Sequence, residues 1–236
     1  MPSELEIYEN HADRYEELIR REDYQGNILA TLERILPLDG CIAADLGTGT
    51  GRLARFLTAR VSYIHGFDLS REMLRVGRDC LAAGASTNWS VSLADHRRIP
   101  LRGGTIGLVV SGWSVSYLAV WNPETWRSEL EQWMEEMNRV LRPGGWIVLF
   151  ESLGTGNETP VRLDHLRNFY TWLDETGFKN TWIRTDYRFE SVDQTENSVR
   201  FFFGDELGDR VRQFNLRVLP ECTGVWWKQT VEARAT

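Results

Sequence analysis

Residues 43–51, AADLGTGTG, decide the fold of this chain. They join a short apolar strand, predicted over residues 41–46, to an amphipathic helix, predicted over residues 52–60. The glycines of the turn stand at alternate positions, where a backbone can bend tightly and a ligand can approach without meeting a Cβ atom. A strand, a glycine turn and a helix N-terminus together predict a cradle for a nucleotide-like ligand, with Asp45 at the end of the strand.

The spacing of the glycines narrows the kind of ligand. Gly47, Gly49 and Gly51 form the pattern G-x-G-x-G, which differs from the G-x-G-x-x-G pattern of dinucleotide-binding turns. The turn contains no Lys-Ser or Lys-Thr pair, so it is not a P-loop for a triphosphate. The turn therefore excludes a triphosphate site and counts against a dinucleotide site.

Two further predicted strands end on acidic residues. Residues 61–67, VSYIHGF, are rich in β-branched and aromatic side chains and lead directly to Asp68. Asp68 lies about twenty residues beyond the glycine turn, where α/β cofactor folds place the acid that binds ribose hydroxyls. Residues 89–93 predict a third strand, which is followed by Asp95. In a parallel sheet, Asp45 and these two acids would share the edge at which open α/β sheets bind ligands.

Four segments resemble the class I S-adenosylmethionine-dependent methyltransferases of the small-molecule type. In chain order they are AADLGTGTGRLARFL, IHGFDLSREML, SLADHRRIPLRGGTIGLVVSGWSVSYL and MNRVLRPGGWIVLFES. They lie within residues 39–152, and their order makes the resemblance far more specific than a glycine motif alone. The cofactor that it implies is S-adenosylmethionine, with S-adenosylhomocysteine as the product.

The resemblance assigns roles to individual residues. It places the glycine turn against the methionine part of the cofactor, Asp68 on the ribose hydroxyls, and Asp95 with His96 beside the adenine. Asp45 would shape the turn and meet the amino end of the methionine. The cofactor-binding residues predicted in this way are Tyr8, Tyr15, Asp45, Gly47, Thr48, Gly49, Gly51, Asp68, Leu69, Met73, Asp95, His96, Ser111 and Trp113.

The N-terminal residues 1–36 predict a helical cap of two helices. In related methyltransferases a short N-terminal helix with a YxxxAxxY-like pattern covers the cofactor, and Tyr8, Ala12 and Tyr15 fit this pattern. Asp23 is predicted to cap the second helix. The alternative interpretation of this pattern is that both tyrosines pack on the protein core.

The fold class implied by the resemblance is α/β. We expect a Rossmann-like, mostly parallel seven-stranded sheet with helices on both faces, in a single domain. Residues 39–152 would form its cofactor-binding core, and residues 153–236 its substrate side. A helical insert over residues 191–218 precedes the last predicted strand.

Composition agrees with an enzyme of this class. The chain has 236 residues and a formal net charge of −7, which disfavours a broad nucleic-acid-binding surface. No run of about eighteen apolar residues predicts a membrane span, and the charged N-terminus lacks the apolar core of a signal peptide. Three cysteines far apart argue against a disulfide framework, and no Cys/His cluster has metal-ligand spacing. We therefore expect a cytoplasmic enzyme with a small-molecule substrate, no metal and no nucleic-acid or membrane partner; the oligomeric state is open.

The substrate side is predicted from residues that follow the strands. Trp113 and Tyr117 lie on the loop after the fourth strand, beyond a strand end where ligands bind, so both are candidate substrate residues. Glu151, at the end of the fifth strand, is another. His165 is the candidate general base, because histidine titrates near neutral pH, and Glu151 is the second candidate. A surface histidine without a catalytic role is the alternative interpretation of His165.

The expected reaction is in-line displacement at the methyl group, driven mainly by positioning and desolvation of the reactants. Two other functions stay open at this stage. A nicotinamide-dependent oxidoreductase also uses a glycine turn and an acid after its second strand. A non-catalytic S-adenosylmethionine-binding protein would keep the cofactor residues and lack transfer. The sequence does not identify the methyl acceptor or the atom that is methylated.

Overall fold

The computed structural model describes residues 3–231. Across them the chain forms a seven-stranded sheet in which β1 to β5 run parallel and β9 is antiparallel to both of its neighbours. The expected Rossmann-like sheet is confirmed. In spatial order its strands are β3 (Trp89–Leu93), β2 (Tyr63–Asp68), β1 (Ile42–Leu46), β4 (Ile106–Gly112), β5 (Leu141–Thr155), β9 (Glu221–Gln229) and β6 (Lys179–Arg184).

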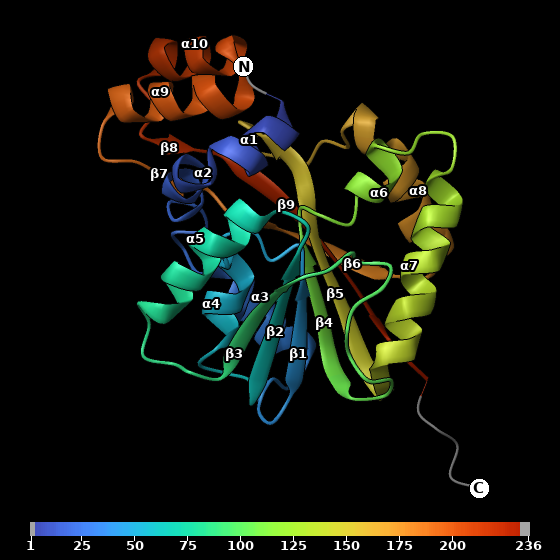
Figure 1. Cartoon of the computed structure of the whole chain (residues 1–236). Coiled ribbons are helices and arrows are strands. Elements are labelled where there is room, and N and C mark those ends of the chain that lie inside the picture. Colours follow the sequence, from blue (N-terminus) through green and yellow to red (C-terminus); the bar gives the residue numbers. More distant parts are fainter. Residues whose placement is uncertain (1–2, 232–236) are drawn as a thin grey trace, which may run out of the picture.

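Helices cover both faces of this sheet (Figure 1). One face carries α3 (Asn27–Ile35), α4 (Arg52–Leu57) and α5 (Arg71–Ala82). The other carries α6 (Tyr117–Val120), α7 (Trp126–Val140), the 3₁₀ turn η1 (Asp164–Leu166) and α8 (Arg167–Glu175).

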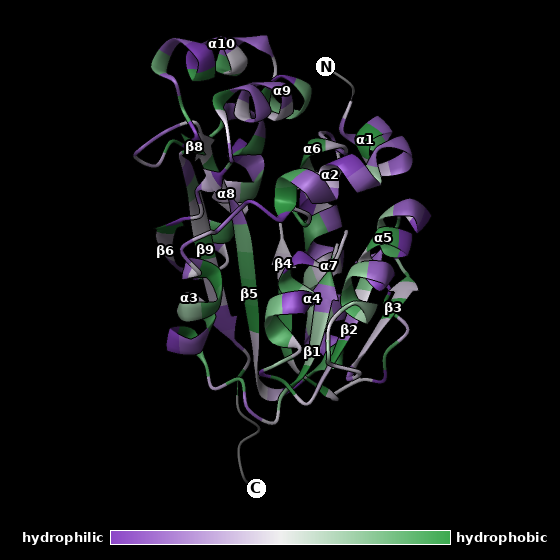
Figure 2. Cartoon of the chain, turned by 90° about the vertical axis from the view of Figure 1, so that its left-hand side faces the viewer, coloured by the Kyte–Doolittle hydropathy of each residue, from purple (hydrophilic) through white to green (hydrophobic). Residues whose placement is uncertain are grey.

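The central strands separate two apolar cores by simple alternation of side chains. Along β4, Leu108 and Val110 pack on the side of α3 and α4, whereas Val109 packs on the side of α7 and α8. All three are fully buried, and the middle of the neighbouring β5 is apolar in Figure 2. A strand buried on both faces needs a continuous apolar run of this kind, and residues 105–111 form such a run in the sequence.

The N-terminal cap differs from the prediction of two helices. It contains α1 (Glu4–Asn10) and α2 (Ala12–Ile19) in addition to α3. The break falls at His11, whose φ of −131° and ψ of 29° leave the helical region. The first predicted helix is therefore divided into α1 and α2. The capping role of Asp23 is confirmed, because its carboxylate accepts hydrogen bonds from the amides of Asn27 (2.8 Å) and Ile28 (2.9 Å).

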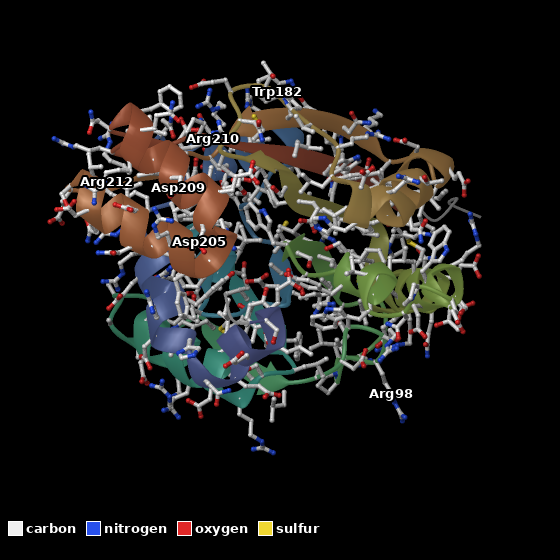
Figure 3. All side chains as sticks on the ribbon, turned by 90° about the horizontal axis from the view of Figure 1, so that it is seen from above. Arg98, Trp182, Asp205, Asp209, Arg210 and Arg212 are labelled. Atoms are coloured by element: carbon white, nitrogen blue, oxygen red, sulfur yellow. The ribbon has the colours of Figure 1, made fainter. Side chains whose placement is uncertain are left out.

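The predicted insert at residues 191–218 consists of two helices and a short strand. Gly204, with a φ of 91°, joins the helices, and a charge network that includes Arg200 with Asp205 and Asp209 holds them together. Figure 3 labels Asp205, Asp209 and Arg212 on this part of the surface. Its elements are α9 (Val192–Phe203), α10 (Asp205–Phe214) and β8 (Val218–Leu219), which pairs with β7 (Tyr187–Arg188).

The cap and the insert meet at the end of the sheet where the parallel strands finish. Figure 1 shows α1, α2, α9 and α10 gathered above that end. Leu18 of α2 packs into the apolar cluster formed by Tyr187, Phe189, Val199 and Val211 of the insert region. Segments from the two ends of the chain therefore enclose the edge at which the sequence places the ligand.

Candidate functional site

The glycine turn has the backbone geometry that its sequence predicts. Gly47, Gly49 and Gly51 have φ values of 69°, 55° and 86°, in the left-handed region that favours glycine. The amides of Gly47 and Thr48 both donate to the carbonyl of Phe67, which fixes the turn against β2. A Cβ atom on Gly47 would lie 1.9 Å from Ser114 Oγ, whereas one on Gly49 would find its nearest neighbour at 4.0 Å. Gly47 is therefore needed for packing, and Gly49 presents an open face.

Asp45 shapes the turn and keeps one carboxylate oxygen free. Its Oδ2 accepts a hydrogen bond of 2.7 Å from the hydroxyl of Thr48. Its Oδ1 is buried and has no hydrogen-bond partner among the described residues. Burial raises the pKa of Asp45 to about 7, against the hydrogen bond from Thr48. A buried acceptor without a partner is unfavourable in the protein alone and is satisfied by a ligand that brings a donor.

Asp68 links the turn to the start of α5. Its Oδ2 accepts a hydrogen bond from the amide of Gly49 (2.9 Å) and its Oδ1 accepts one from the amide of Ser70 (2.8 Å). The hydroxyl of Ser70 caps α5 through the amide of Met73, as the sequence predicts. Each carboxylate oxygen has a second lone pair, so Asp68 can still accept bonds from a ligand diol.

Asp95 and His96 lie in the short turn after β3. Arg97 binds the Asp95 carboxylate through its side chain and its amide, and this interaction lowers the pKa of Asp95. His96 is buried, and burial lowers its pKa to about 4, so the ring is neutral. Its Nε2 lies 3.4 Å from Ser114 Oγ, next to the glycine turn. The sequence did not predict that Arg97 would hold Asp95.

The N-terminal helices close over these strand ends. The carbonyl of Tyr8 accepts a hydrogen bond of 2.8 Å from the hydroxyl of Ser70, and the hydroxyl of Tyr8 lies 2.9 Å from that of Tyr117. The hydroxyl of Tyr15 accepts a bond of 3.2 Å from Arg52. Both tyrosines therefore lie over the site and also pack on its walls.

These groups line one cavity of about 260 Å³, called the first cavity. It brings together twelve of the fourteen residues predicted to bind the cofactor. They are Tyr8, Tyr15, Asp45, Gly47, Thr48, Gly49, Asp68, Leu69, Met73, Asp95, His96 and Trp113.

Gly51 and Ser111 are the two predicted residues that do not line the first cavity. Gly51 starts α4 and faces α5, where a Cβ atom would lie 3.5 Å from Leu81. The hydroxyl of Ser111 is buried and donates to the carbonyl of Leu46 at 2.6 Å. In this structure the first builds the turn and the second joins β4 to β1.

A second cavity, of about 280 Å³, adjoins the first. It contains the other predicted substrate residues, Tyr117 and Glu151, together with His165. Tyr8, Tyr15, Arg52, Trp113 and Tyr117 line both cavities. The two cavities therefore meet at one layer of side chains.

Trp113 is the central residue of this shared layer. Its φ of 51° is unusual for a bulky residue, and such outliers cluster at functional sites. Its ring stacks on Phe150 and lies 3.8 Å below the guanidinium of Arg52. Arg52 in turn forms a buried ion pair with Glu22. The sequence did not predict this pair, although the position of Arg52 directly after the glycine turn places it beside the site.

The predicted base candidates differ in their surroundings. Glu151 is 5% exposed, and burial raises its pKa to about 7 against hydrogen bonds from Ser116 and the amide of Ser152. His165 is exposed and lies in η1 at the border of the second cavity. Glu221, which the sequence gave no reason to select, is also buried in this cavity.

Within residues 3–231 the structure contains no cluster of metal ligands and no membrane-spanning helix. No three His, Cys, Asp or Glu side chains of this part of the chain are grouped so that they could hold a metal ion. No helix found there has the length and apolar character to cross a bilayer.

Comparison with known proteins identifies the class of this site. A family model described as a methyltransferase domain matches residues 44–149, the segment that carries the glycine turn and the acids. The structure of an S-adenosylmethionine-dependent methyltransferase from Aquifex aeolicus superposes with a TM-score of 0.56 at 16% identity, over 84% of this chain and 87% of that chain. Residues 44–149 form a methyltransferase domain, and the chain has the fold of the class I S-adenosylmethionine-dependent methyltransferases. The alternative of a nicotinamide-dependent oxidoreductase is not favoured.

The fold and sequence relatives of this methyltransferase domain are diverse. A Haemonchus contortus phosphoethanolamine N-methyltransferase, solved with phosphomonomethylethanolamine and S-adenosylhomocysteine, superposes with a TM-score of 0.60 at 15% identity, over 94% of this chain and 57% of that chain. A malonyl-[acyl-carrier protein] O-methyltransferase from Salmonella typhimurium is 28% identical over 81% of this chain and 66% of its own length. A demethylmenaquinone methyltransferase from Anoxybacillus flavithermus is 25% identical over 94% of this chain and 90% of its own length. In four such relatives the matched part spans between 55% and 66% of the curated protein. 

The residues of the first cavity fit S-adenosylmethionine, the cofactor of this class. The free Oδ1 of Asp45 offers an acceptor for an amino group, and the open face of Gly49 leaves room for an atom that a Cβ would displace. Asp68 offers oxygen acceptors for the ribose diol.

Proposed function

We propose that this protein transfers the methyl group of S-adenosylmethionine, held in the first cavity, to a small-molecule acceptor held in the second. One observation carries the proposal: the two cavities share a single layer formed by Tyr8, Tyr15, Arg52, Trp113 and Tyr117. A cofactor on one side and an acceptor on the other would be separated only by these side chains. Non-catalytic binding of the cofactor gives no reason for a second cavity at this place.

The cofactor supplies an activated methyl group on a sulfonium, which needs no further activation. The protein therefore has to hold, orient and dehydrate the acceptor, which supplies several kcal/mol in reactions of this kind. Tyr8 and Tyr117, joined by their hydroxyls, keep the layer between the cavities in place. The cap helices α1 and α2 exclude water from above.

Glu151 is our candidate for the group that removes a proton from the acceptor. A general base works best when its pKa is near the working pH, and burial raises the pKa of Glu151 to about 7. Its carboxylate lines the second cavity, whereas His165 is an exposed residue at the border. His165 remains the alternative base and would act at the outer end of the acceptor.

The proposal keeps the expected small-molecule acceptor and cytoplasmic location. The relatives act on different acceptors, a malonyl group on acyl carrier protein and a demethylated menaquinone, according to their names. The acceptor of this protein therefore has to be inferred from its own cavity. The location is supported by the free cysteines Cys41, Cys80 and Cys222, since secreted domains pair such residues.

Titration calorimetry with S-adenosylhomocysteine, and with NAD and NADP as controls, tests the cofactor. We expect micromolar affinity for S-adenosylhomocysteine and none for either nicotinamide. Transfer of labelled methyl from S-adenosylmethionine to a panel of amines, phenols, alcohols and carboxylates then tests catalysis. Binding of the cofactor without transfer to any class would favour the non-catalytic alternative, and preference for a nicotinamide would refute the proposal.

A further inference from the structure

Two buried carboxyl groups line the second cavity and are linked through one serine. The amide of Ser152 donates a hydrogen bond of 2.8 Å to Glu151 Oε1, and the hydroxyl of the same residue donates one of 2.8 Å to Glu221 Oε1. Glu151 and Glu221 are 5% and 2% exposed. One serine therefore ties together two acids from different strands, here called the Glu151–Glu221 pair.

An irregularity in the sheet brings this pair together. The antiparallel register of β5 and β9 shifts between Ser152 and Thr155, where Thr155 becomes the partner of Glu221. Irregularities of this type turn side chains away from the regular alternation and are common beside functional sites. The pair is thus a product of the pairing of β5 with a strand some seventy residues further along the chain.

Glu221 has an unused acceptor in this position. Its Oε2 is buried and has no hydrogen-bond partner among the described residues, although the side chain lines the cavity. Burial raises the pKa of Glu221 to about 8. Buried polar atoms without a partner are rare in folded proteins, so this side chain is a candidate contact for a ligand.

The rest of the cavity wall is aromatic. Besides the tyrosines and Trp113 of the shared layer, it includes Tyr187, Phe202 and Phe203. The faces of aromatic rings attract cations, and a cation among several rings is stabilised further when it is withdrawn from water. The same rings accommodate an apolar or planar molecule.

Acidic groups outnumber basic ones in the lining. Among the described residues, carboxyl groups of Glu4, Glu151 and Glu221 line the cavity, together with the guanidinium of Arg52 and the imidazole of His165. Arg52 is already paired with Glu22 and stacked on Trp113, so its charge is compensated. A cationic ligand stabilises the ionised form of the Glu151–Glu221 pair and is attracted by it, whereas an anionic ligand gains no such attraction.

We propose that the acceptor is a primary or secondary amine with an apolar or aromatic body, whose ammonium group is held by the Glu151–Glu221 pair. The ammonium gives one proton to Glu151, the lone pair that this frees forms the new bond to the methyl carbon, and the bond from that carbon to sulfur breaks to release S-adenosylhomocysteine. This inference rests on the proposed function and specifies its substrate class. It separates this protein from the malonyl O-methyltransferases among its relatives, because a carboxylate acceptor would gain no attraction from the same acids.

Three probes of one shape and different charge test this proposal on protein saturated with S-adenosylhomocysteine. They are 2-phenylethylamine, 2-phenylethanol and 3-phenylpropionate. By calorimetry we expect the amine to bind at least about tenfold more tightly than the alcohol, and the carboxylate to show no binding, because neutral hydrogen bonds are weaker than charge-assisted ones. Equal affinity for the three probes, a preference for the carboxylate, or binding of none of them would overturn the proposal.

Two variants assign the effect to the pair. Glu221→Gln and Glu151→Gln keep the shape and remove the charge, and each should weaken the amine about tenfold or more while the alcohol changes little. Glu158→Gln, at an exposed acid paired with Arg184, is the matched control and should bind the amine like the wild type. An amine affinity unchanged in both Glu151→Gln and Glu221→Gln would contradict the assignment.

The cofactor titration distinguishes this inference from the function on which it rests. If S-adenosylhomocysteine does not bind, the proposed function fails. If it binds with micromolar affinity to the wild type and to both variants, and the amine is still not preferred, only the amine inference fails.

Discussion

The two cavities of this protein are built in different ways. The first is made largely from consecutive residues at strand ends, where backbone amides of the glycine turn and the acids Asp45 and Asp68 are in direct contact. The second is made from side chains of α1, α2, β5, β7, α9 and β9, which come from both ends of the chain. The first depends on backbone conformation and the second on tertiary packing. A cavity of the first kind fits a constant cofactor, and one of the second kind can vary with the acceptor.

The largest expected effect is that of Gly49→Val, which tests the backbone basis of the first cavity. A Cβ atom at this position meets no protein atom closer than 4.0 Å, and the side chain enters the space predicted for the cofactor. We expect S-adenosylhomocysteine affinity to fall more than about 100-fold, which corresponds to about 2.8 kcal/mol, by calorimetry. Gly177→Val is the control, because Gly177 has a φ of 75° and open space around it away from the cavity. Equal loss of binding in both variants would mean that strain alone is responsible.

The next effect concerns Asp68→Ala and the ribose. Removal of a charged acceptor for two hydroxyl groups should reduce S-adenosylhomocysteine affinity by about 1–3 kcal/mol. Because Asp68 also accepts bonds from Gly49 and Ser70, Asp68→Asn should lose less, since its amide oxygen still accepts one bond. Calorimetry on the two variants checks that Asp68→Ala loses more S-adenosylhomocysteine affinity than Asp68→Asn. Unchanged affinity in Asp68→Ala would remove the ribose from this position and weaken the contrast between the cavities.

The stability of the folded protein should depend on pH through the buried acids of the second cavity. Burial raises the pKa of Glu221 from the ordinary value of 4.5 to about 8, so the folded protein holds this proton more tightly than the unfolded chain does. The free energy of unfolding should therefore decrease as pH rises from about 5 to about 9, since one pKa unit corresponds to 1.36 kcal/mol. Buried Asp45 and Glu151 act in the same direction.

Glu221→Gln isolates the contribution of this one group. Between these pH values the variant should lose less stability than the wild type by about 2 kcal/mol, or about 4–8 °C in Tm. Thermal unfolding at several pH values measures it, and Glu158→Gln should follow the wild type. A parallel decrease in Glu221→Gln would show that the acid is not the source of the pH dependence.

The smallest effect is expected at the layer that the two cavities share. Tyr8→Phe keeps the ring and removes the hydroxyl that meets Tyr117 at 2.9 Å, a bond worth about 0.5–1.5 kcal/mol. We expect cofactor and acceptor affinities to fall together by roughly threefold, because the residue lines both cavities. Tyr24→Phe, at an exposed tyrosine, is the control. An effect on only one ligand would place Tyr8 in a single cavity.

Prediction from sequence succeeded where contacts are local. The strand, the glycine turn, Asp68 and the Ser70 cap follow one another in the chain, and each has the residue type that its backbone position requires. Two predicted residues lie outside the first cavity: Ser111, whose buried hydroxyl bonds to Leu46, and Gly51, which faces α5. Both lie next to residues that line it, because neighbours along a strand or turn point to opposite sides.

The sequence by itself determined the parallel sheet, the class of cofactor and most of the first cavity. These features depend on strand periodicity and on φ angles that only glycine adopts readily, and both are properties of a few consecutive residues. Only the tertiary structure decided that Arg52 pairs with Glu22, that Arg97 holds Asp95, and that Glu221 reaches Glu151 through Ser152. Such contacts depend on the pairing of distant strands and on which side chains are withdrawn from water together. No local pattern encodes them, and the proposed acceptor site depends on them.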